Sequence, residues 1–249
     1  MPRLMELLPY GAGTLPFDNA AESIEYVDTY FPEFPFVPQD FEAEAVAAWN
    51  GREFPRIKTQ DWGPVSGEIT DLEAYCARLE RAARDLVPLA PRRWMVLDEP
   101  LFQSIGTPFF PGNPDLALET VNAVINSTDI PAKWGLHVCG NTDFSMLSRL
   151  DIDLFHFDAW MAWDAIKLYK EDLEGFIGSG GIVAPGLVPV GEEDGEGERT
   201  REIAREAVEL LGGMGQRELP LGPACGMKVV TGERAHHVGR LIRDLMAGR

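Results

Sequence analysis

Basic residues are scarce in this chain of 249 residues: 22 Lys and Arg stand against 40 Asp and Glu, which gives a formal net charge of −18. Proteins that bind nucleic acids need clustered Lys and Arg to contact the phosphates. The shortage therefore argues against a nucleic-acid partner and also against docking on an anionic membrane surface. The excess of acidic residues is expected to favour solubility.

Cysteines and long hydrophobic runs are also few. The three cysteines, Cys76, Cys139 and Cys225, are too few and odd in number for a disulfide framework, so we expect a reducing compartment and a cytoplasmic protein. Cys76 has helical spacing and is expected in the core. The longest uncharged run, Gly175–Gly191, is rich in Gly and Pro and too short to span a membrane, so no membrane association is predicted.

Short β-rich runs alternate with segments of helical periodicity, and eight such units fill the chain. Strands are predicted over Leu7–Gly13, Phe34–Pro38, Arg56–Trp62, Arg93–Asp98, Lys133–Cys139, Leu154–Asp158, Gly181–Leu187 and Glu218–Ala224. Helices are predicted over Asn19–Thr29, Phe41–Trp49, Asp71–Leu86, Asn113–Ile125, Phe144–Leu150, Ala162–Phe176, Glu198–Leu211 and Gly232–Met246.

This alternation predicts an α/β fold with a parallel sheet. Eight units in 249 residues predict a compact (β/α)8 TIM barrel that forms a single domain over residues 1–249. An open doubly wound sheet is the alternative. No G-x-G-x-x-G motif follows a predicted strand and opens a helix, so a dinucleotide site is not expected.

His137 and Cys139 stand two apart on a predicted strand. Residues i and i+2 of a strand point to the same face, so both side chains can reach one ion. Cys225 follows another predicted strand at the same height. One imidazole and two thiolates are a ligand set typical of zinc, with a fourth position left for a substrate or a weaker ligand. The alternative is a core histidine with two buried cysteines; the second cysteine at another strand end favours zinc.

Two groups of carboxylates also end predicted strands. Asp98 and Glu99 are adjacent, so only one of them can face the barrel interior, and a helix cap or an ion pair with a nearby arginine is the alternative role. Asp158 has apolar neighbours and, as a buried carboxylate, needs a partner such as a metal or a substrate cation. His156 has the same phase as Asp158 but lies deeper in the strand, and Asp61 is a further carboxylate near a strand end.

Several motifs occur in an order that resembles the catalytic domain of the cobalamin-independent methionine synthase family, within the uroporphyrinogen decarboxylase/methionine synthase superfamily of barrels. They are Ala12–Pro16, Tyr30–Gln39, Gly63-Pro64, Leu97–Pro100, His137–Asp143, Phe157–Ala159 and Pro223–Gly226. The His-x-Cys motif with a distant Cys-Gly is the specific part. The likeness covers nearly the whole chain and is greatest to short, stand-alone members of the family.

The resemblance implies roles for individual residues. His137, Cys139 and Cys225 would be the zinc ligands, and Asp158 is the nearest match to a glutamate ligand of the full synthases. Asp98 matches the carboxylate that binds the amino group of homocysteine, which favours Asp98 over Glu99 as the residue that faces the interior. The predicted catalytic residues are accordingly Asp98 and Asp158.

The resemblance also implies a substrate site. Thr14 and the backbone near Ala12 match the pocket for the homocysteine carboxylate, and Gln39 stands where the synthases carry a second glutamate for the amino group. The predicted substrate-binding residues are therefore Ala12, Thr14, Gln39 and Asp98. The missing glutamate departs from the family pattern and puts homocysteine itself in doubt as the acceptor.

The expected function is a zinc-dependent transfer of a methyl group to a small-molecule thiol, homocysteine or a similar compound, as in methionine biosynthesis. Zinc would hold the acceptor as a thiolate nucleophile. The methyl donor is left open between a methylcorrinoid and a methylfolate. The alternatives are a corrinoid-linked methyltransferase with another thiol, or a barrel that binds a small molecule or a metal without catalysis.

Overall fold

The structure is a computed structural model that describes residues 5–193 and 196–248. Its strands are β1 (Glu6–Pro9), β2 (Arg56–Trp62), β3 (Arg92–Asp98), β4 (Lys133–Val138), β5 (Leu154–Asp158), β6 (Ile182–Val188) and β7 (Glu218–Pro223). They form one parallel sheet in the order β1-β7-β6-β5-β4-β3-β2. The predicted α/β class with a parallel sheet is confirmed.

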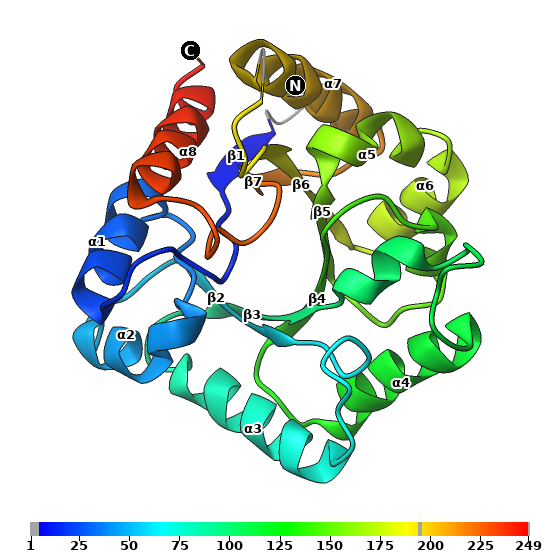
Figure 1. Cartoon of the computed structure of the whole chain (residues 1–249), viewed down its shortest axis with the longest axis horizontal. Helices are drawn as coiled ribbons and strands as arrows, with labels where there is room; N and C mark the ends of the chain where they lie inside the picture. Colours follow the sequence, from blue (N-terminus) through cyan, green and yellow to red (C-terminus); the bar gives the residue numbers. More distant parts are fainter. Residues whose placement is uncertain (1–4, 194–195, 249) are drawn as a thin grey trace.

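Helices surround the curled sheet and cover its outer face (Figure 1). They are α1 (Ala20–Tyr30), α2 (Glu42–Ala48), α3 (Leu72–Asp85), α4 (Pro114–Ser127), α5 (Ala159–Ile166), α6 (Lys170–Gly178), α7 (Glu196–Gly213) and α8 (Gly232–Met246). Three short 3-10 helices are η1 (Gln39–Phe41), η2 (Pro100–Ser104) and η3 (Phe144–Ser148). Across the part of the chain that is described, no helix is both long enough and apolar enough to cross a membrane.

The apolar faces of the helices pack on the outer side of the sheet. In α3, Tyr75, Cys76, Leu79 and Ala83 follow helical spacing and are buried. They share one hydrophobic cluster with outward-facing strand residues such as Met95. Full burial of a side chain like Leu79 contributes about 1.5–3 kcal/mol. Cys76 is thus a core residue, as its spacing predicted.

The prediction of a regular strand over Phe34–Pro38 is wrong. The segment makes a single parallel bridge, in which Phe36 pairs with Lys58 of β2. Val37 N–H donates to the Lys58 carbonyl at 2.9 Å, and Lys58 N–H donates to the Pro35 carbonyl at 3.0 Å. The sheet therefore has seven strands among the described residues instead of the predicted eight.

Proline explains why this segment pairs so little. Pro35 and Pro38 have no backbone N–H, so they cannot donate to a neighbouring strand. On the other side, the N–H of Gln39 donates to the carbonyl of Gly13 at 2.9 Å, beyond the end of β1. The sheet is therefore TIM-like but open between β1 and β2, and the closed eight-stranded barrel predicted from the sequence is not observed.

The helix predicted over Ala162–Phe176 is two helices. Asp158 caps α5, which begins earlier than predicted, and the chain then turns before α6. In that turn, Leu168 N–H donates to the Ala165 carbonyl at 3.0 Å, and the ring of Tyr169 packs against Phe144. The helix predicted over Phe144–Leu150 is the 3-10 helix η3, whereas α8 has the predicted bounds.

Inside the sheet, a smaller hydrophobic cluster lies toward the amino ends of the strands. Leu8, Trp94, Val96 and Leu154 belong to this inner cluster. Alternate residues of a strand share a face, so the next inward positions toward the strand ends can be read from the sequence. They are polar: Lys58 and Gln60 on β2, Asp98 on β3, His137 on β4, and His156 and Asp158 on β5. A polar layer therefore lies at the carboxyl ends of the strands.

Candidate metal centre

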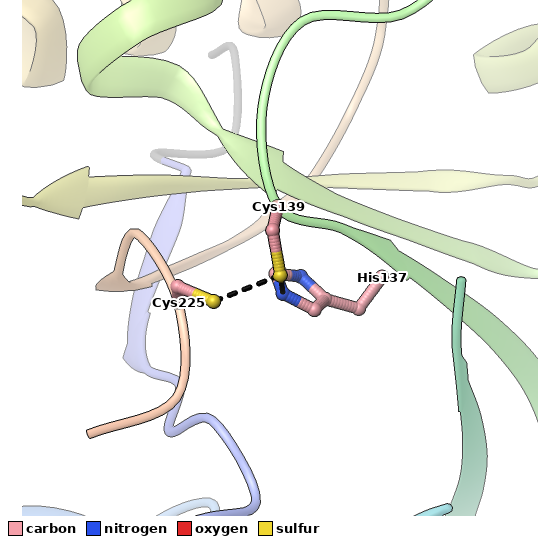
Figure 2. Close-up of side chains that lie close together, drawn as sticks. All are labelled: His137, Cys139 and Cys225. Atoms are coloured by element: carbon pink, nitrogen blue, oxygen red, sulfur yellow. Dashed lines mark hydrogen bonds between the residues drawn. The ribbon is translucent and has the colours of Figure 1, made fainter. Parts of the chain in front are cut away.

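Three side chains converge at this end of the sheet. His137 belongs to β4, Cys139 follows it directly, and Cys225 lies just after β7 (Figure 2). His137 Nε2 lies 3.1 Å from Cys139 Sγ, and the sulfurs of Cys139 and Cys225 are 2.8 Å apart. All three potential ligand atoms lie within 4.8 Å of one another. The structure thus brings together the three residues predicted to bind a metal.

Glycine permits the approach of Cys225 to the other two residues. A Cβ on Gly186 of β6 would lie 2.7 Å from the Cα of Ala224 and from the carbonyl oxygen of Pro223. Because Gly186 has no side chain, the end of β7 can lie close to β6. Cys225 is therefore held over the end of the sheet, facing Cys139.

Two further loops pack against the Cys225 loop. A Cβ on Gly226 would lie only 2.1 Å from Thr14 Oγ1, and Met227 N–H donates to the Thr14 carbonyl at 3.0 Å. Gly13 packs in the same way against the side chain of Gln39. The loop after β1 therefore contacts both the start of η1 and the loop after β7 beside the cluster.

The cysteine pair shares one proton. The hydrogen bond from Cys139 lowers the pKa of Cys225 well below its ordinary value, although burial opposes this, and His137 lowers it further. The same hydrogen bond, together with burial, raises the pKa of Cys139. Burial lowers the pKa of His137, but Cys225 and Asp98 outweigh this effect, so the net direction is upward. The pKa values of the two thiols are thus shifted in opposite directions, and Cys225 is the more acidic of the two.

The chemistry of these donors fits zinc. Zinc sites use thiolate sulfur and neutral imidazole nitrogen, and Cys225 has the lowered pKa that a thiolate ligand requires. At Zn–S distances of about 2.3 Å, tetrahedral geometry separates two sulfurs by roughly 3.8 Å. The sulfurs of Cys139 and Cys225 would therefore have to move apart by about 1 Å from their present 2.8 Å to share an ion. Both cysteines are partly exposed, so the site is accessible.

Asp98 faces the interior, and Glu99 does not. Gln60 Nε2 donates to Asp98 Oδ1 at 2.5 Å, and Gln39 Nε2 lies 3.4 Å from Asp98 Oδ2. Burial raises the pKa of Asp98, and the nearby positive charges of His137 and Lys58 only partly offset this. Glu99 instead accepts hydrogen bonds from the backbone of the loop after β2, on the other side of the strand. The orientation predicted for this pair is the one observed.

Asp158 lies near the cluster but outside its ligand set. Its carboxylate accepts a hydrogen bond from Met161 N at 3.1 Å and so caps the first turn of α5. Burial raises its pKa, and the Cys225 thiolate raises it further. Asp61, the other carboxylate considered from the sequence, forms an ion pair with Arg78 of α3 on the outer face of the sheet. Asp61 therefore takes no part in this site.

The predicted substrate-binding residues lie near the cluster of His137, Cys139 and Cys225: Ala12 and Thr14 follow β1, Gln39 begins η1 and Asp98 ends β3. Gln39 contacts Asp98, Thr14 contacts Gly226, and Ala12 is fully buried within the loop after β1. Gln39 Nε2 also donates to the backbone carbonyl of Gln60 at 3.0 Å. The role of these residues in substrate binding stays a prediction.

Sequence reasoning missed the polar side chains beneath the cluster. Lys58 is fully buried; its Nζ donates to Gln60 Oε1 and lies 4.4 Å from the centre of the Tyr10 ring. Burial lowers the pKa of Lys58 to about 7, although Asp98 opposes the shift. The available signal was the run Arg56-Ile-Lys-Thr-Gln60 in β2. Strands of an all-parallel sheet are usually continuously apolar, so polar residues at alternate positions indicate a polar interior.

No protein-family model matches the chain, and no curated protein matches it. A solved structure of a B12-independent methionine synthase from Shewanella sp. W3-18-1, in complex with selenomethionine, has a TM-score of 0.50 and 16% sequence identity. That match covers 78% of this chain and 64% of the synthase, so it spans less than two thirds of the synthase's length.

Two other solved structures are less similar by TM-score. A Listeria monocytogenes protein provisionally described as a vitamin-B12-independent methionine synthase has a TM-score of 0.44 and 17% identity, over 76% of this chain and 64% of that one. A β-glucuronidase from an uncultured Clostridium sp. has a TM-score of 0.46 and 11% identity, over 98% of this chain and 51% of that one. The resemblance to B12-independent methionine synthase predicted from the sequence is therefore confirmed at the level of the fold.

Proposed function

We propose that the protein is a zinc-dependent methyltransferase that moves a methyl group to a small-molecule thiol. The observation that carries this proposal is the convergence of His137, Cys139 and Cys225 within 4.8 Å at the carboxyl ends of the strands. Active sites of barrel enzymes lie at this end of the sheet. The fold shared with a B12-independent methionine synthase supports the same function.

The three ligands suit this chemistry. Zinc, when bound, would lower the pKa of an acceptor thiol so that it is a thiolate at neutral pH. His137 contributes no negative charge, whereas two cysteine thiolates balance a divalent ion. The paired cysteines are accessible from solvent, so the acceptor can reach the site.

The polar part of the acceptor would bind to the surrounding loops. Asp98 offers a carboxylate that is held in place by Gln60, and Gln39 offers an amide beside it. Thr14 lies next to the Cys225 loop and places a hydroxyl near the metal cluster. Asp158 supplies a second carboxylate close enough to influence Cys225 and would act with Asp98 during the reaction.

Homocysteine or a similar thiol would be the acceptor, and a methylcorrinoid or a methylfolate the donor, with a role in methionine biosynthesis. Electron transfer is not needed, because the thiolate sulfur forms the new S–C bond as the bond from the methyl carbon to the donor breaks. The donor leaves with the electron pair of that bond, and the thiol proton is lost when the thiolate forms.

Metal analysis and a transfer assay test the proposal. Protein purified under reducing conditions should contain one zinc per chain, and Cys225→Ser should lose it. Cys76→Ser is the matched control, since Cys76 lies in the core on α3 away from the cluster. X-ray absorption at the zinc edge should gain one sulfur when homocysteine is added.

Methyl transfer is then measured with methylcobalamin and with 5-methyltetrahydrofolate as donors. Formation of a thioether that requires zinc and Cys225 would support the proposal. Absence of zinc would overturn it. Bound zinc with an unchanged sulfur count across a panel of thiols would instead favour a barrel that binds metal without catalysis.

A further inference from the structure

His156 is a buried side chain that the proposed reaction does not use. It lies on β5, directly opposite His137 of β4 in the parallel register. The two rings stack with their centroids 4.6 Å apart and an interplanar angle of 27°. Their Nδ1 atoms are 2.7 Å apart, which is a hydrogen bond. The side chains are 2% and 1% exposed, so the contact is shielded from water.

The proton positions in this pair follow from the chemistry of imidazole. In a hydrogen bond between two Nδ1 atoms, one nitrogen carries the proton and the other accepts it. A metal binds the unprotonated nitrogen, so His137 can offer Nε2 to zinc only with its proton on Nδ1. His156 Nδ1 must then be the acceptor, and the proton of His156 must lie on its own Nε2.

The surroundings of His156 restrict the orientation of its ring. Burial lowers the pKa of His156, and the carbonyl of Pro223 on β7 only partly opposes this shift. No partner with good hydrogen-bond geometry reaches Nε2 within residues 5–193 and 196–248. The ring of Tyr10 packs against His156 with a centroid distance of 4.9 Å and prevents it from turning away. His156 is therefore held by its ring contacts and by His137.

We propose that His156 is a positioning residue for His137: its Nδ1 accepts the proton of His137 Nδ1 and thereby presents Nε2 of His137 to the metal. The inference rests on the zinc site of the proposed function. Ligating histidines generally donate their second N–H to a carboxylate, a carbonyl or a water, and loss of that partner typically weakens metal binding 10- to 100-fold. Here the partner is a second imidazole on the adjacent strand.

When no metal is bound, the protons of His137 and His156 can take the opposite positions. His137 Nε2 can then donate to Cys139 Sγ, 3.1 Å away, and its Nδ1 accepts from Nδ1 of His156. Metal binding therefore moves the proton of His137 from Nε2 to Nδ1 and that of His156 from Nδ1 to Nε2.

Zinc affinity in the full chain, measured by competition with a chromogenic chelator, tests the role of His156. His156→Phe keeps a stacking ring and removes the acceptor, so we expect affinity to fall 10- to 100-fold. His156→Asn keeps an acceptor close to the position of Nδ1 and should bind zinc within a few-fold of wild type. Tyr10→Phe is the matched control, because its buried hydroxyl has no partner among the described residues, and it should leave affinity unchanged.

Two-bond ¹H–¹⁵N correlation spectra of the wild-type protein provide a second test that needs no variant. In the zinc-loaded protein, His156 should carry its proton on Nε2 and His137 on Nδ1. A zinc-loaded protein with His156 protonated on Nδ1 would overturn the inference, as would a His156→Phe variant with wild-type zinc affinity. Wild-type protein that takes up no zinc at all would instead overturn the proposed function.

Discussion

Lys58 is a fully buried side chain in the polar layer at the carboxyl ends of the strands. Its ammonium group contacts Gln60 and the face of the Tyr10 ring, and its nearest carboxylate is Asp98 at the far end of the Gln60 amide. Gln60 thus accepts from the lysine and donates to the aspartate, which fixes the orientation of its amide. A lysine buried without a direct ion pair is costly in its charged form. We therefore expect Lys58 to make the free energy of unfolding depend on pH.

Lys58→Met should flatten the dependence of stability on pH. The pKa of Lys58 falls from 10.5 to about 7 on folding because the side chain is buried. Between these values the unfolded chain holds the extra proton, so the wild-type free energy of unfolding rises with pH by up to about 1.4 kcal/mol per unit from this group. The variant should lack this slope in urea titrations of metal-free protein. Equal slopes in both proteins would show that Lys58 keeps its ordinary pKa.

Gly226→Ala should disturb the loop that carries Cys225. The added Cβ would lie 2.1 Å from Thr14 Oγ1, so one of the two loops must move. We expect a loss of about 1–3 kcal/mol in the free energy of unfolding and weaker zinc binding. Adding Thr14→Ala removes the clashing oxygen and should restore most of the stability. Gly175→Ala in α6, where a Cβ meets nothing within 4 Å, is the matched control and should stabilise the protein slightly.

The secondary-structure elements show where sequence patterns are sufficient. The bounds of α8 were predicted correctly, because Thr231 caps it and its buried residues recur at helical spacing. The segment around Phe36 was predicted as a strand from its aromatic residues, but the prolines on both sides leave it with one bridge. The continuous helix predicted after β5 also failed, since the turn near Tyr169 depends on packing against Phe144, which is distant in sequence.

The start of α5 offers a test of whether Asp158 is a helix cap or a metal ligand. Its carboxylate accepts from Met161 N at 3.1 Å, a contact that an asparagine can reproduce. Asp158→Asn should keep the stability and zinc affinity of wild type, whereas Asp158→Ala should lose about 1 kcal/mol of stability. Zinc affinity is measured by chelator competition and stability by chemical unfolding. A drop in zinc affinity for Asp158→Asn at unchanged stability would identify Asp158 as a ligand.

At the scale of the whole molecule, the cluster of His137, Cys139 and Cys225 could be predicted from the sequence more readily than the interior side chains that surround it. His137 and Cys139 share a face of one strand by spacing alone, and the motif around Cys225 identified the third member of the cluster. The interior contacts of Lys58 and His156 depend on the curvature of the sheet and on which strands are neighbours. The opening between β1 and β2 depends likewise on how few hydrogen bonds the intervening segment can form.

The net charge of −18 should make stability depend on salt. Excess negative charge repels itself in the compact state, and salt screens this repulsion. We expect the midpoint of thermal unfolding to rise as NaCl increases from about 10 mM to 200 mM, over which the Debye length falls from about 30 Å to below 10 Å. A falling midpoint would show that the exposed ion pairs, such as that of Arg149 with Asp115, outweigh the repulsion.

The residues of the candidate metal centre are widely separated in the chain, and Cys225 lies 86 positions after Cys139. A growing polypeptide that has just passed β4 therefore carries two of the three donors, His137 and Cys139, and the third, Cys225, follows β7. An ion bound by all three would tie the middle of the chain to its last strand and stabilise only the assembled sheet. Metal uptake would then be a late event in biogenesis. Only chains in which β7 has joined the sheet would bind the ion through all three residues.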